Sequence, residues 1–282
     1  MRWRIVIDRK TMVQFTALTF AIAILVSGAL IVLGPFGYKV HNWVYSIQDF
    51  AMNIPFAIYI LSPAIASFII LKRNHKVTNL MDWLKTVFYV KNKIFPYLFV
   101  IAGLALYFGI HLAVSGRIEL ALPFYAFFLS LPGNLIIGGL EETGWSYILL
   151  PGLNKKYGFV VSCLIAGVIW SFWHIPLFFI PGTNHGEGLI NFWMFVVQLM
   201  AFRFFYGAIY RISGKGGVFM CVLFHTMFNA ASPLFGTMTM TWAGTIAANA
   251  ALVLISICTV AIYDRIAGDA GSAIGLNGQR LQ

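Results

Sequence analysis

The chain has 282 residues, of which 60% are hydrophobic and only 10% are charged, and its mean hydropathy is +0.83. A composition this apolar exceeds what a water-soluble domain can bury, so lipid is the expected solvent. A net charge of +10 by itself suggests nucleic acid, but basic loops beside membrane spans give the same total. We therefore predict no nucleic-acid partner and a protein embedded in the lipid bilayer.

Eight apolar runs of spanning length follow one another along the chain. Backbone in hydrocarbon must satisfy its own hydrogen bonds, and runs this long exclude the short alternating strands of a barrel. We therefore predict an all-α membrane protein, a polytopic bundle of about eight transmembrane helices. The predicted spans are Thr11–Gly34, Ala51–Leu71, Ile94–Val114, Leu120–Leu150, Phe159–Ile180, Leu189–Tyr210, Gly217–Phe235 and Trp242–Tyr263.

A short amphipathic segment separates the second and third spans. Leu80, Trp83, Leu84 and Val87 recur at helical spacing, and polar residues fill the positions between them. This pattern is typical of a helix that lies in the headgroup layer with its apolar face toward the lipid. We predict an interfacial amphipathic helix after the second span.

The basic residues predict the orientation. Nearly all of the 19 lysines and arginines fall in the terminal segments and in alternate loops; the exceptions are Lys39, Arg117 and Arg203. Positive charge beside spans is retained in the cytoplasm, so we predict a multi-pass protein of the cell membrane with both termini cytoplasmic. Residues 1–263 are expected to form one transmembrane domain with a motif-bearing core at 120–235, followed by a mobile cytoplasmic tail at 264–282.

Several polar residues interrupt the fourth predicted span. Carboxylates inside hydrocarbon cost roughly 2.5 kcal/mol or more each, so they need partners or a water-filled cavity. Asn134, Gly138, Glu141 and Trp145 are spaced at four, three and four residues, and Glu142 follows the first carboxylate. This spacing predicts one shared helical face that is polar and thin enough for close helix approach.

Two later spans carry histidines. Trp170 and His174 lie four residues apart in the fifth span, and Pro176 predicts a kink beside the imidazole. His225 and Asn229 lie four residues apart in the seventh span. An acid, two imidazoles and an amide at similar predicted depth can share one cavity and activate water there.

The same residues resemble the motifs of a known family. Glu-Glu-Thr-Gly-Trp-Ser at 141–146, Trp-Ser-Phe-Trp-His-Ile-Pro at 170–176 and Phe-His-Thr-Met-Phe-Asn at 224–229 are similar to the three motifs of the CPBP family. That family groups type II CAAX prenyl endopeptidases with bacteriocin-immunity and abortive-infection proteins. The similarity spans roughly residues 120–233.

The resemblance implies a glutamate-type intramembrane endopeptidase that needs no cofactor. By this likeness Glu141 and His174 activate water, His225 and Asn229 form the oxyanion site, and Glu142 supports the catalytic residues. The implied substrate is a membrane-associated protein or peptide. A prenylated CAAX protein, a bacteriocin precursor, a signal peptide and an immunity target all remain open.

One position departs from the family pattern. The first motif has an arginine at its sixth position, where this chain has Ser146. A missing guanidinium leaves a neighbouring carboxylate poorly fixed. Arg203 in the sixth span either replaces that charge or extends to the cytoplasmic surface, and the sequence favours the second interpretation.

Three alternative functions remain. Glu141, His174 and His225 are also the ligand types of a catalytic zinc site, although no His-Glu-x-x-His motif is present. A non-catalytic membrane immunity or binding protein is the second alternative, motivated by Ser146. A proton-coupled transporter is the third, but we find no repeated halves. His111 and His185 match no motif, so we expect structural or loop roles for them.

Overall fold

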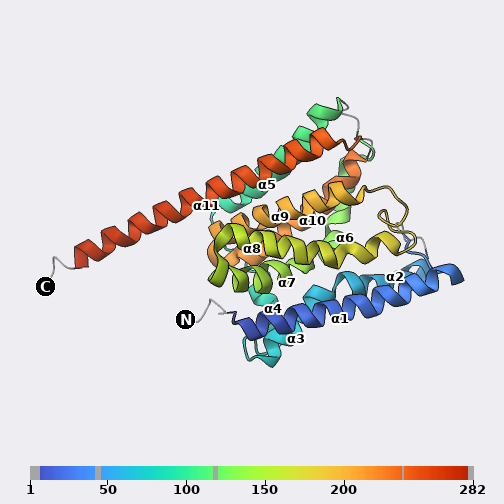
Figure 1. Ribbon diagram of the computed structural model, residues 1–282, viewed down its shortest axis with the longest axis horizontal. Coiled ribbons are helices and arrows are strands. Elements are labelled where there is room, and N and C mark those ends of the chain that lie inside the picture. Colours follow the sequence, from blue (N-terminus) through green and yellow to red (C-terminus); the bar gives the residue numbers. More distant parts are fainter. Residues whose placement is uncertain (1–6, 42–45, 117–119, 237, 279–282) are drawn as a thin grey trace.

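The computed structural model describes residues 7–41, 46–116, 120–236 and 238–278, and all regular secondary structure in these segments is helical (Figure 1). The prediction of an all-α polytopic membrane protein is confirmed. The elements, with 3₁₀ or π turns written η, are α1 (Arg9–Leu33), η1 (Gly34–Phe36), α2 (Ile47–Ile60), α3 (Ser62–Arg73), α4 (Leu80–Val87), α5 (Ile94–Ser115), α6 (Tyr125–Ile136), η2 (Gly139–Glu141), α7 (Glu142–Gly144), η3 (Trp145–Leu149), α8 (Leu150–His174), η4 (Ile175–Phe179), α9 (Phe192–Ser213), η5 (Gly214–Gly216), α10 (Gly217–Ala231), η6 (Ser232–Phe235) and α11 (Trp242–Gly278).

The helix α1 turns several small and polar residues inward, beside Phe15 and Leu30, and turns other large apolar residues outward. Its buried face includes Thr11, Thr19 and Ser27, whereas Ile24 and Leu25 are 63% and 74% exposed. A soluble helix has the opposite arrangement. Small residues let helix backbones approach closely in lipid, while exposed leucine and isoleucine side chains have hydrocarbon as their solvent.

Six helical stretches of the described residues are long and apolar enough to span a bilayer, or seven if the pair α2 and α3, bent by 54°, counts as one span. The stretch Tyr125–Phe179 has 55 residues and covers most of the fourth and fifth predicted spans. A straight helix of that length would measure about 80 Å, far more than a hydrocarbon layer of ~30 Å. The chain instead breaks at Gly158, where φ is +71°.

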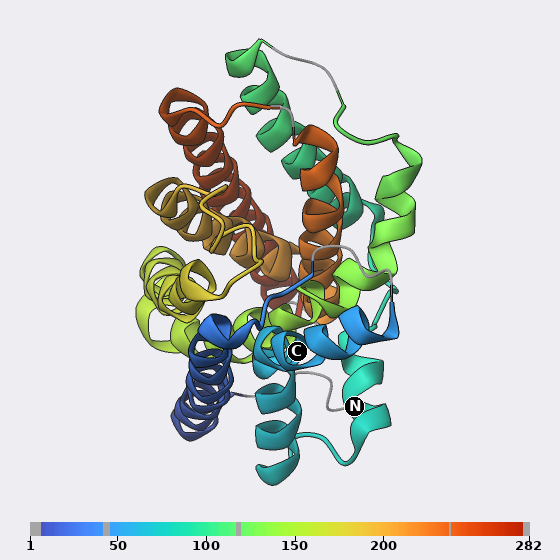
Figure 2. The same cartoon turned by 90° about the vertical axis from the view of Figure 1, so that its right-hand side faces the viewer.

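The motif-bearing helices lie in the middle of the bundle. α8 packs on α9, and α10 packs on α6 and α9. On one side α11 packs on α9 and α5, and on the other α1 packs on α2 and α3 (Figures 1 and 2). This layering surrounds the central helices with protein, so polar side chains between them are shielded from lipid.

The predicted amphipathic segment forms the helix α4. Asn79 caps its first turn by accepting a hydrogen bond from the Asp82 backbone N–H. Trp83 is buried and its indole N–H donates to Ser67 Oγ on α3 at 3.2 Å. Leu80 is 52% exposed. The apolar face is therefore divided between protein and surroundings, and its place in the headgroup layer stays a prediction.

Contacts at one end of the bundle join the segments predicted to be cytoplasmic. Lys76 pairs with Asp8 at 3.6 Å, and Lys155 donates to the Ile7 carbonyl at 2.6 Å. Arg211 on α9 pairs with Asp264 on α11 at 2.8 Å. α11 continues as a helix past the predicted domain boundary at 263. The mobility predicted for residues 264–282 stays a prediction, and residues 279–282 lie outside the described part.

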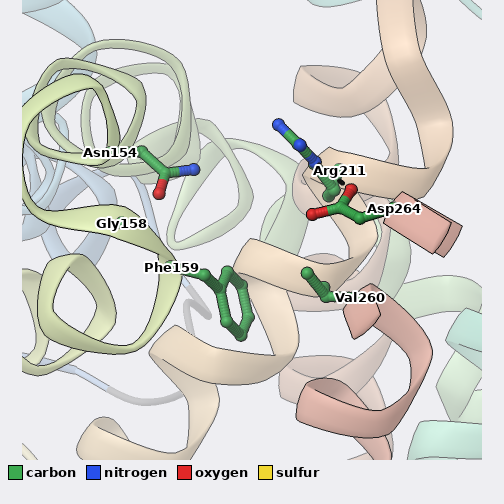
Figure 3. A pocket seen from close by; sticks show the side chains of 6 residues that line it. All are labelled: Asn154, Gly158, Phe159, Arg211, Val260 and Asp264. Carbon is green, nitrogen blue, oxygen red and sulfur yellow. Dashed lines mark hydrogen bonds and ion pairs between the residues drawn. The ribbon is translucent and has the colours of Figure 1, made fainter. Parts of the chain in front are cut away.

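The Arg211–Asp264 pair lines a small cavity where α8, α9 and α11 meet. Its volume is about 220 Å³, and Asn154, Gly158, Phe159 and Val260 complete the lining (Figure 3). Both charged side chains are partly exposed, at 41% and 43%. None of the predicted catalytic residues lines this cavity, so the pair offers a reference for ion pairs outside the candidate site.

Candidate active site

The first motif lies in a broken helix. α6 ends at Ile136, and Gly138 has a φ of +121°, a conformation that favours glycine. The 3₁₀ turn η2, the short helix α7 and the π turn η3 follow before α8 begins. The prediction that Asn134 shares a helical face with Glu141 is wrong, because the turn at Gly138 interrupts the spacing between them.

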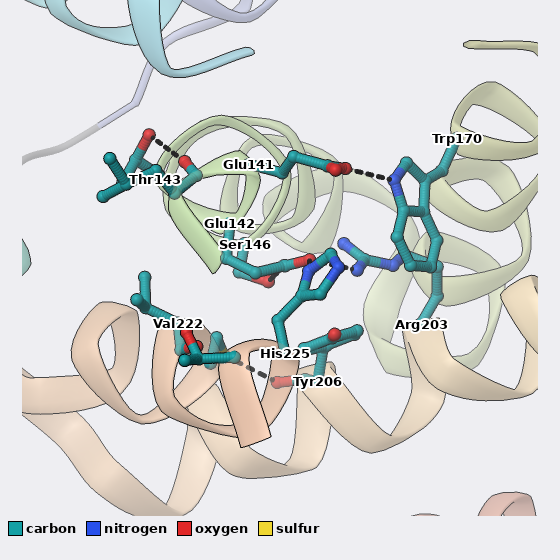
Figure 4. Close-up of polar contacts among 12 residues, drawn as sticks. Glu141, Glu142, Thr143, Ser146, Trp170, Arg203, Tyr206, Val222 and His225 are labelled. Atoms are coloured by element: carbon teal, nitrogen blue, oxygen red, sulfur yellow. Dashed lines mark hydrogen bonds and ion pairs between the residues drawn. The ribbon is translucent and has the colours of Figure 1, made fainter. Parts of the chain in front are cut away.

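Trp170 on α8 contacts both residues that were predicted to activate water. Glu141, only 3% exposed, accepts a hydrogen bond from the Trp170 indole N–H at 3.2 Å (Figure 4). The Trp170 carbonyl lies 2.9 Å from Nδ1 of His174. A carbonyl only accepts, so Nδ1 carries the proton and Nε2 of the neutral ring keeps its lone pair. The fold thus positions Glu141 and His174 through one buried residue.

The second carboxylate, Glu142, has three side-chain partners from three elements. Its Oε1 accepts from Arg203 Nη2 at 2.7 Å and from His225 Nδ1 at 3.2 Å. Its Oε2 accepts from the hydroxyl of Ser146, one turn later (Figure 4). Glu142 is fully buried, so these charge-assisted bonds fix its orientation.

Arg203 is also fully buried, and its guanidinium lies between two aromatic rings. The Cζ atom is 3.8 Å from the ring centre of Trp170 and 4.2 Å from that of Tyr206. The interpretation that this side chain extends to the cytoplasmic surface is wrong. Stacking between rings and the ion pair with Glu142 compensate for removing the charge from water.

The third motif faces the turn at Gly138. His225 and Asn229 lie one turn apart on α10, and both approach Gly138 closely. A Cβ atom added at Gly138 would lie 2.3 Å from Asn229 Nδ2 and 3.3 Å from His225 Nε2. Because Nδ1 of His225 faces Glu142, its Nε2 and the Asn229 amide are directed to the backbone just before Glu141. Trp170 is a common neighbour of Glu141 and His225, because it donates to Glu141 and its ring lies 6.0 Å from that of His225.

This geometry makes Gly138→Ala a sensitive test. A left-handed φ costs an alanine about 1–2 kcal/mol, and the new Cβ must displace the Asn229 amide. Since displacement of a site group by ~1 Å can cost about 100-fold in rate, we expect a loss of that order. Gly133→Ala is the matched control, because nothing lies within 4 Å of a Cβ there. Equal cleavage rates for the two variants, each measured on folded protein, would contradict the assigned geometry.

Phe195, in the first turn of α9, joins His174 to the loop between η4 and α9. The ring of Phe195 lies 5.2 Å from that of His174 and 4.7 Å from that of His185 in the loop. The loop is fixed by hydrogen bonds from the Gly182 N–H to Glu187 at 2.8 Å and from Thr183 Oγ1 to the Leu177 carbonyl at 2.9 Å. His185 thus has the structural loop environment expected for it.

The packing of His185 predicts a pH-dependent loop. Burial disfavours the charged ring and lowers its pKa from 6.5 to about 4. Between these values the opened loop binds a proton that the packed loop does not, so the loop loses stability as pH falls from 6.5 toward 4. We expect faster hydrogen exchange of the amides at 182–188 at pH 5 than at pH 7, after correction for intrinsic rates. His185→Phe should remove this difference; its persistence would refute the assignment.

The predicted zinc ligands do not converge. Among the described residues, no three histidine, cysteine, aspartate or glutamate side chains are grouped so as to hold a metal ion. His225 Nδ1 is directed to Glu142, and His174 Nδ1 is directed to a backbone carbonyl. These bonds leave Nε2 of both rings open, as in many zinc-bound histidines, so they do not argue against zinc. The separation of the three side chains does not fit a shared zinc ion, and we derive no step through one.

Sequence reasoning missed part of the network. Trp170 was identified only as sharing a face with His174, whereas it contacts Glu141, His174, His225 and Arg203. Ser146 was identified only as a missing arginine, whereas its hydroxyl donates to Glu142. The sequence signal for these roles was spacing: Trp170 lies one helical turn from His174, and Ser146 lies one turn from Glu142. Helix packing alone also explains this spacing, so it did not reveal the roles.

Comparison with known proteins identifies the segment that carries this network. Residues 120–231 match the family model described as type II CAAX prenyl endopeptidase, Rce1-like. Over 105 residues the chain is 22% identical to CAAX prenyl protease 2 of Methanococcus maripaludis, in an alignment that covers 34% of this chain and 36% of that protein. The chain thus spans about a third of the length of this curated relative.

The matched segment includes every residue of the three motifs. Arg203 and Ser146 lie inside it as well. The resemblance to the type II CAAX prenyl endopeptidases is therefore confirmed for residues 120–231, which are similar to the Rce1-like family.

Proposed function

We propose that this multi-pass membrane protein is an intramembrane endopeptidase of the CAAX type, in which Glu141 and His174 activate a water molecule. The observation that carries the proposal is the shared contact of both residues with Trp170, within a segment similar to CAAX proteases. A carboxylate held by one hydrogen bond keeps lone pairs free to accept a proton from water. The lone pair on Nε2 of His174 provides a second acceptor for relaying that proton.

The attacked carbonyl becomes an oxyanion that needs hydrogen-bond donors. In our proposal His225 Nε2 and the Asn229 amide provide them, because both are directed to the turn before Glu141. Fixed donors in a site that excludes bulk water stabilise the developing charge without reorganising during the reaction. Glu142 does not contact the substrate in this proposal; it orients His225.

The proposed substrate is a membrane-associated protein or peptide. The names of the matched family and of its archaeal relative point to a prenylated CAAX protein as the first substrate to test. A bacteriocin precursor or a signal peptide would present a similar bond near the membrane. We further propose that the protein resides in the cell membrane with both termini cytoplasmic, which the clustering of basic segments at one end supports.

The other candidate functions have less support. The non-catalytic immunity protein was motivated by the missing arginine, yet Glu142 has a guanidinium partner in Arg203. For a metallopeptidase, the predicted ligands are not grouped. Cleavage that a membrane-permeant chelator abolishes and zinc restores would nevertheless reverse this ranking.

The deciding experiment compares the membrane proteomes of cells that express the parent or the Glu141→Gln variant at equal levels. We expect C-terminally or juxtamembrane-truncated peptides in cells with the parent and their intact precursors in cells with the variant. Adding a purified farnesylated CAAX peptide and its unprenylated counterpart to both proteins in liposomes tests the substrate class. Identical cleavage by parent and variant would end the proposal.

A further inference from the structure

Glu142 has a buried counter-charge because Arg203 lies beside it. Arg203 and Glu142 are both completely buried, and their side chains meet at 2.7 Å. A buried guanidinium is costly unless it is paired, and removing one partner of such a pair leaves an uncompensated charge. This ion pair therefore links α9 to the first motif inside the protein, where burying either charge without the other would be costly.

The hydrogen bonds of Glu142 determine what His225 is able to do. Nδ1 of His225 lies 3.2 Å from the carboxylate, which as an anion only accepts, so Nδ1 must donate. The carboxylate therefore fixes the orientation of the ring and directs Nε2 away from Glu142. Glu142 is held in turn by a cation on its other side.

Arg203 provides that cation from α9. Ser146 occupies the position from which a residue of the first motif could provide one instead. Ser146 lies one helical turn after Glu142, and its hydroxyl already contacts Oε2. A longer, charged side chain at this position would reach the same carboxylate. Arg203 already approaches the other oxygen of this carboxylate, and Trp170 and Tyr206 enclose its guanidinium.

We infer that Arg203 is the positioning cation of this site: it holds Glu142 in the orientation that binds His225 Nδ1, so that Nε2 of His225 faces the Gly138 turn. Arg203 acts through Glu142 and does not contact the substrate. The inference rests on the proposed peptidase function for its kinetic consequence. Its structural consequence, the orientation of the His225 ring, can be measured without any substrate.

The test relocates the charge within the site. Arg203→Met removes the cation, and a double variant combines it with Ser146→Arg, which places a guanidinium beside Glu142 in the vacated volume. Arg203→Lys keeps a charge but loses the planar stacking. Arg211→Met is the matched control, because Arg211 lies on the same helix and pairs with a carboxylate at 2.8 Å, but outside the site.

We expect Arg203→Met to lower kcat about 10- to 100-fold, as for the loss of other supporting partners, with KM little changed. The double variant should recover most of that loss, Arg203→Lys should fall between, and Arg211→Met should match the parent. In ¹⁵N-histidine NMR spectra, the ring resonances of His225 should coincide in the parent and the double variant and should shift in Arg203→Met.

The outcomes separate the two proposals. Unchanged kcat in folded Arg203→Met, or a folded double variant as inactive as the single one, overturns the role of Arg203. If the parent cleaves nothing, the peptidase proposal fails, and the NMR spectra alone decide the positioning role. If Arg203→Met does not fold, the double variant and Arg203→Lys carry the comparison, with folding monitored by gel filtration and thermal unfolding.

Discussion

The Glu141→Gln variant is expected to lose about 10²- to 10⁴-fold in kcat, the contribution of a positioned general base. The amide oxygen of glutamine can still accept the hydrogen bond from the Trp170 indole, so the fold of the site is retained. What the variant lacks is an acceptor for the proton of water. The measurement is initial-rate cleavage of a membrane-anchored peptide by purified protein in liposomes.

A second glutamate provides the control for this prediction. Glu187 lies exposed in the loop before α9 and accepts a hydrogen bond from a backbone N–H at 2.8 Å, which glutamine also accepts. Glu187→Gln should therefore cleave at the parental rate. A Glu141→Gln variant that retains parental kcat would show that another group takes the proton, and the mechanism proposed for Glu141 would have to be abandoned.

Glu142→Gln should instead reduce stability. The substitution leaves the guanidinium of Arg203 buried without a counter-charge, and breaking a buried ion pair from one side costs about 3–5 kcal/mol. We expect a decrease of that size in the free energy of unfolding, measured by equilibrium denaturation in mixed micelles. Combining Glu142→Gln with Arg203→Met should recover part of the loss, because no charge then remains unpaired.

The exposed ion pair of α9 is the reference for this prediction. Arg211 and Asp264 meet at 2.8 Å, nearly the separation of Arg203 and Glu142, but both are more than 40% exposed. Solvent screens such pairs, so Asp264→Asn should cost no more than about 1 kcal/mol. Equal destabilisation by Asp264→Asn and Glu142→Gln would contradict the view that burial determines the cost.

The helical membrane fold could be predicted because it follows from local properties of the chain. Apolar runs of bilayer length exclude other solutions, and α1, α5, α9 and α10 coincide closely with predicted spans, while α11 begins with one and continues past its predicted end. The interruptions were harder to place. The bend between α2 and α3 and the break at Gly158 arise where packing imposes backbone conformations that composition alone does not encode.

The candidate site was predicted in its residue types and only partly in its geometry. Glu141 and His174 contact Trp170, His225 and Asn229 approach Gly138, and the catalytic roles of all four remain predictions. The shared face of Asn134 and Glu141 was wrong, because one glycine with a positive φ redirects the chain between them. No spacing rule detects such a turn, since glycine is also common within transmembrane helices.

The sequence by itself determined that this protein lies in lipid and which polar side chains need partners there, because hydrocarbon makes each unpaired charge costly. Only the tertiary structure decided which partners they have. Arg203 is 61 residues from Glu142 along the chain, and whether it reaches water or that carboxylate depends on how α9 rotates against α8 and α10. Helix rotation is a property of packing between elements, and the hydropathy of a single span does not specify it.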